Sequence, residues 1–244
     1  MKLFQIAVLV FFNLQISQAQ TSGKIDYTET LKIEIEFDGM TEDMKKMVPP
    51  AHTKQKELLF GKDRSLYLTK KGEVAEDIEM ESDDGSFKIQ FKTDDEVEDV
   101  LFKDFASKHF GHQKGLLGKP FIVEDDLQKY DWKLTGEKIK YLGYECQKAV
   151  IENDEDFIIA WFTPSIPVQI GPNDYHGLPG AILMLSINDG KKAFKATDIV
   201  LEFNVEGLIS KPKGHKVVDQ ATYDKIEEEK LEELKKMYST KKKN

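Results

Sequence analysis

Hydrophobic and polar residues alternate along the beginning of the chain. Between residues 24 and 37, every even position is polar, and every odd position except Glu29 is apolar. A period of two residues is typical of a strand with one buried side and one solvent-facing side. At about 3.3 Å per residue, this strand would be roughly 45 Å long. Because ordinary strands are much shorter, the pattern predicts a strand that bends within a curved sheet.

Further strands are predicted by shorter alternations and apolar runs that lie between turn sequences. The turns are rich in glycine, asparagine and aspartate, as in Asp83-Asp84-Gly85 and Asn188-Asp189-Gly190. Many strands with few helices indicate a mainly β fold built on a curved antiparallel sheet. The predicted strands span residues 57–60, 65–70, 86–92, 132–134, 145–152, 156–162, 181–187 and 199–205.

Two segments have helical character. Residues 41–48 begin with a capping threonine and end before Pro49-Pro50, which predicts a short early helix. Residues 222–238 favour a helix throughout, with an inner stripe formed by Tyr223, Ile226, Lys230, Leu234 and Met237. Long strands around a short early helix resemble the half-barrel of periplasmic lipoprotein carriers. We expect the C-terminal helix or a loop at 104–120 to close the apolar concave face of the sheet.

The first 19 residues have the features of a secretory signal peptide. Lys2 precedes an apolar run at 3–12, and Ser17 and Ala19 are the small residues expected before a cleavage site. This run is shorter than the ~20 apolar residues of a transmembrane helix, and no later segment reaches that length. The single cysteine, Cys146, is far from the cleavage site, so we expect no lipid anchor. We therefore expect residues 20–244 to form one domain that does not span a membrane and is periplasmic, with secretion as the alternative.

The charge balance excludes nucleic acid as a partner. The chain has 35 basic and 44 acidic residues, a formal net charge of -9, and Arg64 is its one arginine. Proteins that read phosphates or base edges use the planar guanidinium group, whereas nearly every cation here is a lysine. The lone cysteine excludes an intramolecular disulfide, so packing must stabilise the fold.

Candidate catalytic or metal-binding residues are few. His109 and His112 have the spacing of two metal ligands on a helix, but the neighbouring glycines disfavour a helix, and surface loop histidines are the favoured interpretation. Asp174 and His176 suggest acid–base chemistry, yet spacing alone supplies no nucleophile. The acidic residues at 94–99 lack the pattern of a calcium loop and are interpreted as a solvated surface. Because no catalytic or nucleotide-binding motif is present, we expect no enzyme activity and no cofactor.

The most informative segment joins the predicted strands at 156–162 and 181–187. Its glycines and prolines specify a fixed backbone path, which favours a rigid connection that packs closely against a neighbour. The alternative interpretation is a binding loop for a ligand or a partner. The residues that would carry binding are Trp161, Gly171, Pro172, Tyr175, His176, Gly177, Leu178, Pro179 and Gly180.

The same segment resembles a known protein family. The sequence Gly177-Leu178-Pro179-Gly180-Ala181-Ile182, introduced by Gly171-Pro172, is similar to the hallmark of the GLPGLI family of exported Bacteroidota proteins, with alanine in place of its second leucine. The flanking sequences at 138–149, 160–163 and 166–167 also look like the pattern of this family. The resemblance implies an exported envelope protein of unknown molecular function and supplies no catalytic residues.

Three functions are consistent with these features. A curved sheet with an apolar concave face favours a non-catalytic binding or carrier module for an apolar small molecule or a lipid. The first alternative is an interaction or assembly factor that contacts an envelope protein, such as an outer-membrane transporter. The second alternative is a metal-dependent hydrolase that uses His109, His112 and a carboxylate.

Overall fold

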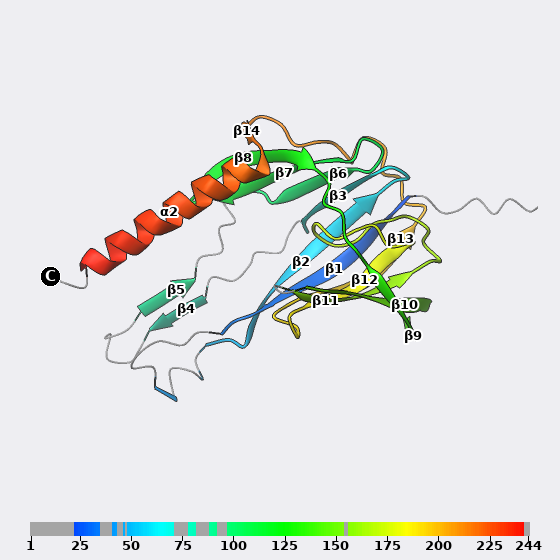
Figure 1. The fold of residues 1–244 in the computed structure, drawn as a ribbon, viewed down its shortest axis with the longest axis horizontal. Helices are drawn as coiled ribbons and strands as arrows, with labels where there is room; N and C mark the ends of the chain where they lie inside the picture. The colour runs from blue at the N-terminus through cyan, green and yellow to red at the C-terminus, as the bar shows by residue number, and fades with distance from the viewer. Residues whose placement is uncertain are drawn as a thin grey trace, which may run out of the picture.

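One large sheet dominates the described part of the chain. The computed structural model describes residues 22–34, 41–42, 46, 48–70, 78–81, 88–91, 97–153 and 156–241. Twelve strands form a curved, unclosed sheet, and the C-terminal helix α2 (Gln220–Lys241) follows the last of them. The predicted fold class, a mainly β protein with a curved sheet and a C-terminal helix, is confirmed (Figure 1).

The first strand of the chain lies in the middle of this sheet. The twelve strands are β1 (Gly23–Lys32), β2 (Ala51–Phe60), β3 (Arg64–Thr69), β6 (Val100–Asp104), β7 (His109–Leu116), β8 (Lys119–Asp126), β9 (Lys133–Tyr141), β10 (Tyr144–Glu152), β11 (Phe157–Thr163), β12 (Ala181–Ile187), β13 (Lys192–Leu201) and β14 (Lys216–Val218). Their order is β14-β8-β7-β6-β3-β2-β1-β13-β12-β11-β10-β9, and β14 pairs parallel to β8. The other neighbours are antiparallel, as predicted. A separate antiparallel pair consists of β4 (Ile78–Glu81) and β5 (Lys88–Phe91).

β1 is shorter than the alternation predicted. It ends at Lys32 because its neighbours β2 and β13 begin opposite Lys32 and Leu31. Just beyond that point the Ile33 N–H still donates to the Pro50 carbonyl at 3.1 Å, but Pro50 lies outside β2, and Leu31 is already exposed. Residues 35–37 of the predicted strand lie outside the described residues.

The strand predicted at 199–205 is displaced, whereas that at 181–187 is found as β12. β13 occupies residues 192–201, and Phe203 and Val205 follow it in an irregular segment that packs against the sheet. Their alternation therefore reflects contact with an apolar surface and not strand pairing. The remaining predicted strands overlap β2, β3, β5, β9, β10 and β11.

Residues 104–120, expected to form a closing loop, form strands instead. β7 carries two glycines and two histidines, so its own β propensity is weak, and pairing with β6 and β8 stabilises it. A Cβ atom at Gly111 would lie 3.1 Å from the Lys211 side chain, so the glycine permits this close approach. The strand thus depends on pairing within two consecutive hairpins, and its own sequence lacks the alternation that predicts a strand.

The C-terminal helix is confirmed and is longer than the predicted 222–238. Asp219 caps it, because its carboxylate accepts a hydrogen bond from the Thr222 backbone N–H at 2.7 Å. Tyr223, from the predicted inner stripe, is buried and donates a hydrogen bond to the carbonyl of Gly115 on β7 at 3.3 Å. Half of the early helix predicted at 41–48, namely residues 43–45 and 47, lies outside the described residues, and the signal peptide at 1–19 lies wholly outside them.

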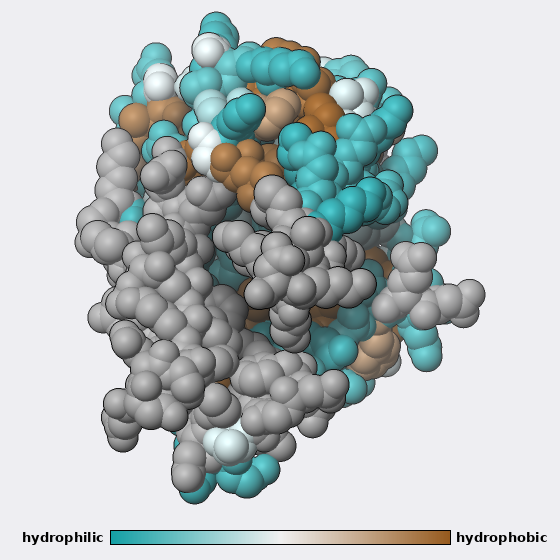
Figure 2. Space-filling model, turned by 90° about the vertical axis from the view of Figure 1, so that its left-hand side faces the viewer, coloured by the Kyte–Doolittle hydropathy of each residue, from teal (hydrophilic) through white to brown (hydrophobic). Residues whose placement is uncertain are grey.

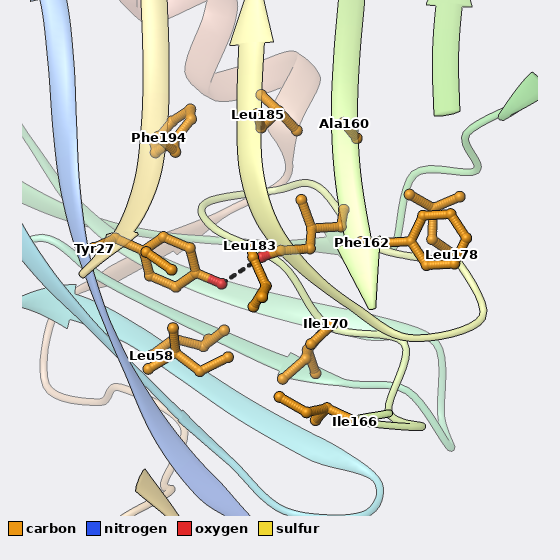
Figure 3. Packing of buried hydrophobic residues seen from close by; sticks show 14 of the residues in the cluster. Tyr27, Leu58, Ala160, Phe162, Ile166, Ile170, Leu178, Leu183, Leu185 and Phe194 are labelled. Carbon is orange, nitrogen blue, oxygen red and sulfur yellow. Dashed lines mark hydrogen bonds between the residues drawn. The ribbon is translucent and has the colours of Figure 1, made fainter. Parts of the chain in front are cut away.

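The chain's own residues fill much of the concave face. Residues 164–180, between β11 and β12, form a covering segment that lies inside the curve of the sheet. Four of its side chains belong to the main core cluster: Ile166, Val168, Ile170 and Leu178. Figure 3 shows Ile166 and Ile170 near Leu58 of β2, and Leu178 beside Phe162 of β11. The segment therefore packs against the sheet, as its glycines and prolines indicated.

Two further segments also pack against the sheet. On the opposite face, residues 202–215 form a second cluster with β2, β3 and β6, consisting mainly of Leu59, Leu66, Phe102, Phe203, Val205 and Ile209. On the concave face, Tyr223 of α2 packs against Phe121 and Val123 of β8. Figure 1 shows α2 beginning beside β8 and extending beyond the sheet.

Candidate functional site

A pocket lies on the concave face between the covering segment and α2. Its floor consists of β6 and β7, where Lys103 and Phe110 are paired and therefore lie on the same face. The walls include His176 from the covering segment and Gln220 from α2. We call this cavity the central pocket. Its volume of about 430 Å³ falls in the range of small-molecule sites.

Lys103 is a buried cation of the central pocket. It is 1% exposed, and its ammonium donates hydrogen bonds to the backbone carbonyls of Gly171, at 3.4 Å, and Asn173. An ammonium has three N–H donors, so one is left for the pocket. Burial lowers the pKa of Lys103 to about 8, and the nearby Asp174 carboxylate opposes this shift. Lys103 thus ties the covering segment to β6 and still offers one donor.

Lys103 is expected to make the free energy of unfolding depend on pH in the alkaline range. Because its pKa is lower in the folded chain, the unfolded chain binds more protons between about pH 8 and pH 10, and the free energy of unfolding rises with pH there. In Lys103→Met this contribution is absent. Between about pH 8 and pH 9.5, the free energy of unfolding of the wild type should therefore rise relative to that of the variant by roughly 1 kcal/mol per pH unit. Urea unfolding of both proteins across this range measures the difference, and a constant difference would contradict the expectation.

A chain of charged groups orients His112. The Asp99 carboxylate accepts hydrogen bonds from His112 Nε2 at 2.7 Å and from the Lys56 ammonium at 2.6 Å. Burial alone would raise the pKa of Asp99, but these two partners hold it well below its usual range. An ionised carboxylate only accepts hydrogen bonds, so Nε2 of His112 carries a proton and Nδ1 is left for the pocket. Asp99 makes these bonds while 46% of its side chain stays exposed, and Glu98 is exposed, which agrees with the interpretation of a solvated surface there; residues 94–96 lie outside the described residues.

Aromatic rings surround His176. The ring centroids of Tyr130 and Phe105 lie 5.5 Å and 5.7 Å from that of the imidazole. His176 Nδ1 lies 2.7 Å from the backbone carbonyl of Asp174, which only accepts, so Nδ1 carries a proton. Burial and the Lys103 ammonium lower the pKa of His176. The neutral ring is therefore favoured, and its Nε2 is a hydrogen-bond acceptor.

The segment predicted to bind divides into three groups of residues. The buried residues, which hold the covering segment against the core, are Gly171, Pro172, Leu178 and Gly180. The half-buried residues are Tyr175 and His176, and the ring of Tyr175 lies 5.3 Å from that of Tyr130. The exposed residues are Gly177 and Pro179. Of these eight, His176 lines the central pocket.

Three other sequence candidates lie in different surroundings. Trp161 is half-buried on β11, where the Lys148 ammonium is 5.9 Å from its ring centroid. His109 is exposed and lies 2.8 Å from Asp126. Residues three apart on a strand point to opposite faces, so His109 and His112 do not form a pair of metal ligands, and they lie on β7 instead of a surface loop. Among the described residues, no three His, Cys, Asp or Glu side chains are grouped to hold a metal ion.

Lys103 and Tyr130 were not among the residues predicted from the sequence. A signal for Lys103 existed, because Leu101 and Lys103 occupy alternate positions and therefore share the buried face of β6. Tyr130 has no such local signal, since its ring contacts depend on how the covering segment folds back.

Trp132 was placed in a strand, but it precedes β9 and donates a hydrogen bond to the His176 carbonyl at 2.9 Å.

A second, more apolar cavity lies between α2 and the β7–β8 hairpin. Its volume is about 320 Å³, with Leu117 and Phe121 on the hairpin side and Ile226 on the helix side. In Figure 2, apolar side chains gather near the top, at the height of α2 and β8 in Figure 1, among mainly hydrophilic ones. No helix in the described ranges combines the length and the apolar character needed to cross a membrane.

Comparisons with known proteins give a fold relationship and one family similarity. A family described as "Protein of unknown function (Porph_ging)" matches residues 151–184, which include the Gly177–Ile182 motif. Two structures of PNGF-II, in the P21 and C2 space groups, match with TM-scores of 0.54 and 0.53, at 16% and 18% sequence identity. Each match covers 84% of this chain and 33% or 32% of the PNGF-II chain, so this chain spans about a third of PNGF-II. At this identity the likeness is one of fold. No curated protein matches the chain.

Proposed function

We propose that the chain is a non-catalytic binding module whose ligand occupies the central pocket. The observation that carries the proposal is the convergence of Lys103, His112 and His176, which come from three separate segments. Each is held by protein partners in a way that leaves one polar atom for a ligand. A few fixed polar groups in a cavity of this volume are typical of a ligand site.

The contents of the concave face favour a polar ligand over an apolar one. Ile166, Ile170 and Leu178 occupy the surface on which an apolar cargo was expected to bind. The central pocket, in contrast, is lined by several charged and polar side chains.

The proposal includes a periplasmic location, which rests on the signal-peptide features of residues 1–19. Native mass spectrometry of protein purified from the periplasm of cells that express the whole chain tests both points. We expect a polypeptide that begins at Gln20 and carries the extra mass of one small ligand.

Two variants make the mass measurement specific to the central pocket. His112→Phe removes a ring nitrogen from the pocket and is expected to lose the ligand mass. His215→Phe changes an exposed histidine that does not line the pocket, and it is the matched control, expected to keep the ligand mass. An uncleaved cytosolic polypeptide would contradict the location. A wild type without extra mass, or an extra mass that survives His112→Phe, would contradict the binding site.

A further inference from the structure

The chemical class of the ligand follows from the polar atoms that the central pocket presents. Neutral His176 offers Nε2 as an acceptor, and a neutral His112 ring would offer Nδ1 in the same way, because their other nitrogens donate to Asp174 and Asp99. The third N–H of Lys103 is a donor. A ligand that matches this set needs groups that both donate and accept hydrogen bonds.

An anionic ligand does not fit the charges around the pocket. Three carboxylates line it, those of Asp125, Asp126 and Asp174. The N-terminus of α2, which would otherwise attract an anion, is already occupied. Asp125 accepts a hydrogen bond from the Gln220 backbone N–H at 3.2 Å, and Asp219 accepts one from Thr222. A phosphate or carboxylate would therefore meet carboxylates of like charge. It could not bind the backbone N–H groups of Gln220 and Thr222 either, because both already donate to aspartates.

A cationic ligand fits poorly for the opposite reason. Two lysines, Lys103 and Lys114, line the same cavity, and the ammonium of Lys114 lies 3.9 Å from the ring centroid of Tyr223. Like charges in a partly buried site repel strongly because water screens them little. The described residues also offer no cluster of three ligating side chains for a metal ion.

We infer that the central pocket binds a neutral, hydroxyl-rich small molecule, with the chemistry of a polyol or a sugar ring. Each hydroxyl both donates and accepts, so such a ligand satisfies the imidazole nitrogens and the Lys103 N–H together without adding charge. Phe110, Leu101 and Leu127 line the pocket as well and supply apolar surface for the carbon side of a ring. This inference rests on the proposed function and specifies its ligand.

A panel of probes tests the inference by ¹H–¹⁵N NMR on the whole protein. Glucose, N-acetylglucosamine and inositol are the neutral probes, inorganic phosphate and citrate the anions, and spermidine and Zn²⁺ the cations. We expect at least one neutral probe to shift the signals of Lys103, His112 and His176 in a saturable way, and the charged probes to leave them unchanged. Saturable shifts by a charged probe alone would overturn the ligand class and leave the binding module standing. If no probe shifts these signals, the inferred ligand class is also overturned. The native mass measurement then tests separately whether the chain is a binding module.

Matched variants tie the effect to a ring nitrogen. His176→Phe keeps an aromatic ring between Tyr130 and Phe105 but removes the acceptor Nε2, so binding of the neutral probe should weaken about tenfold or more. His176→Gln retains a hydrogen-bonding side chain and should lose less. His215→Phe, at an exposed position outside the pocket, should bind as the wild type does. Equal affinities for the wild type and His176→Phe, with both spectra those of a folded protein, would overturn the inference.

Discussion

Gly180→Ala is expected to destabilise the fold by about 3 kcal/mol or more. Gly180 is buried with φ +155°, and a Cβ atom there would lie 2.1 Å from the carbonyl oxygen of Thr163. The atoms in conflict belong to the backbone at the end of β11, so no side chain can rotate away to relieve the contact. Urea unfolding should show a lower midpoint with an unchanged slope.

Gly177→Ala is the matched control for this substitution. Gly177 lies three residues earlier in the same segment, also with positive φ, +92°, but nothing lies within 4 Å of a Cβ placed there. The control should therefore cost only the backbone strain, about 1 kcal/mol. Equal losses in the two variants would show that the close approach to Thr163 does not determine the need for glycine at position 180.

Ile170→Ala is expected to cost about 2–5 kcal/mol, because it leaves a cavity between the covering segment and the sheet. Ile170 is fully buried, and its carbonyl accepts a hydrogen bond from the Ile182 backbone N–H at 2.9 Å, so the backbone around it is held in place and can collapse only in part. The new cavity would be apolar. A fluorescent apolar dye should bind to the variant and not to the wild type.

Gln169→Ala is the control for that experiment, since Gln169 is the exposed neighbour of Ile170 in the covering segment. It should change stability by about 0.5 kcal/mol or less. If the wild type already binds the dye, and Ile170→Ala changes only the amount bound, the concave face is not filled by the covering segment. That result would restore the apolar carrier hypothesis.

The sequence predicted correctly the strands that bury an apolar side, but it did not predict those that line the central pocket. β12 was predicted with its observed bounds, because its residues pack into the core. β7 was taken for a loop because its inward positions include His112 and Lys114, which line the central pocket instead of a core. Polar residues at inward positions break the alternation from which a strand is predicted.

The candidate site was predicted in part for a similar reason. Glycines and prolines marked the covering segment, and His176 from that segment does line the central pocket. Its partners could not be inferred, because Lys103 and Tyr130 are brought to it by long-range packing. The sequence pattern of Asp174 and His176 suggested acid–base chemistry, and in the structure the His176 ring contacts the backbone carbonyl of Asp174. The spacing of Asp174 and His176 in the sequence indicated which residues lie close together, but not which of their atoms are in contact.

The central position of β1 has a consequence for how the molecule folds. Gly23 of β1 pairs with Leu201 and Leu31 with Lys192 of β13, although the strands β2 to β12 lie between these partners in the sequence. Pairings between residues so far apart must close very long loops, and chains dominated by such contacts fold slowly. The strands on either side of the β1–β13 ladder belong to one sheet through this pairing, so the sheet is complete only after β13 has joined β1.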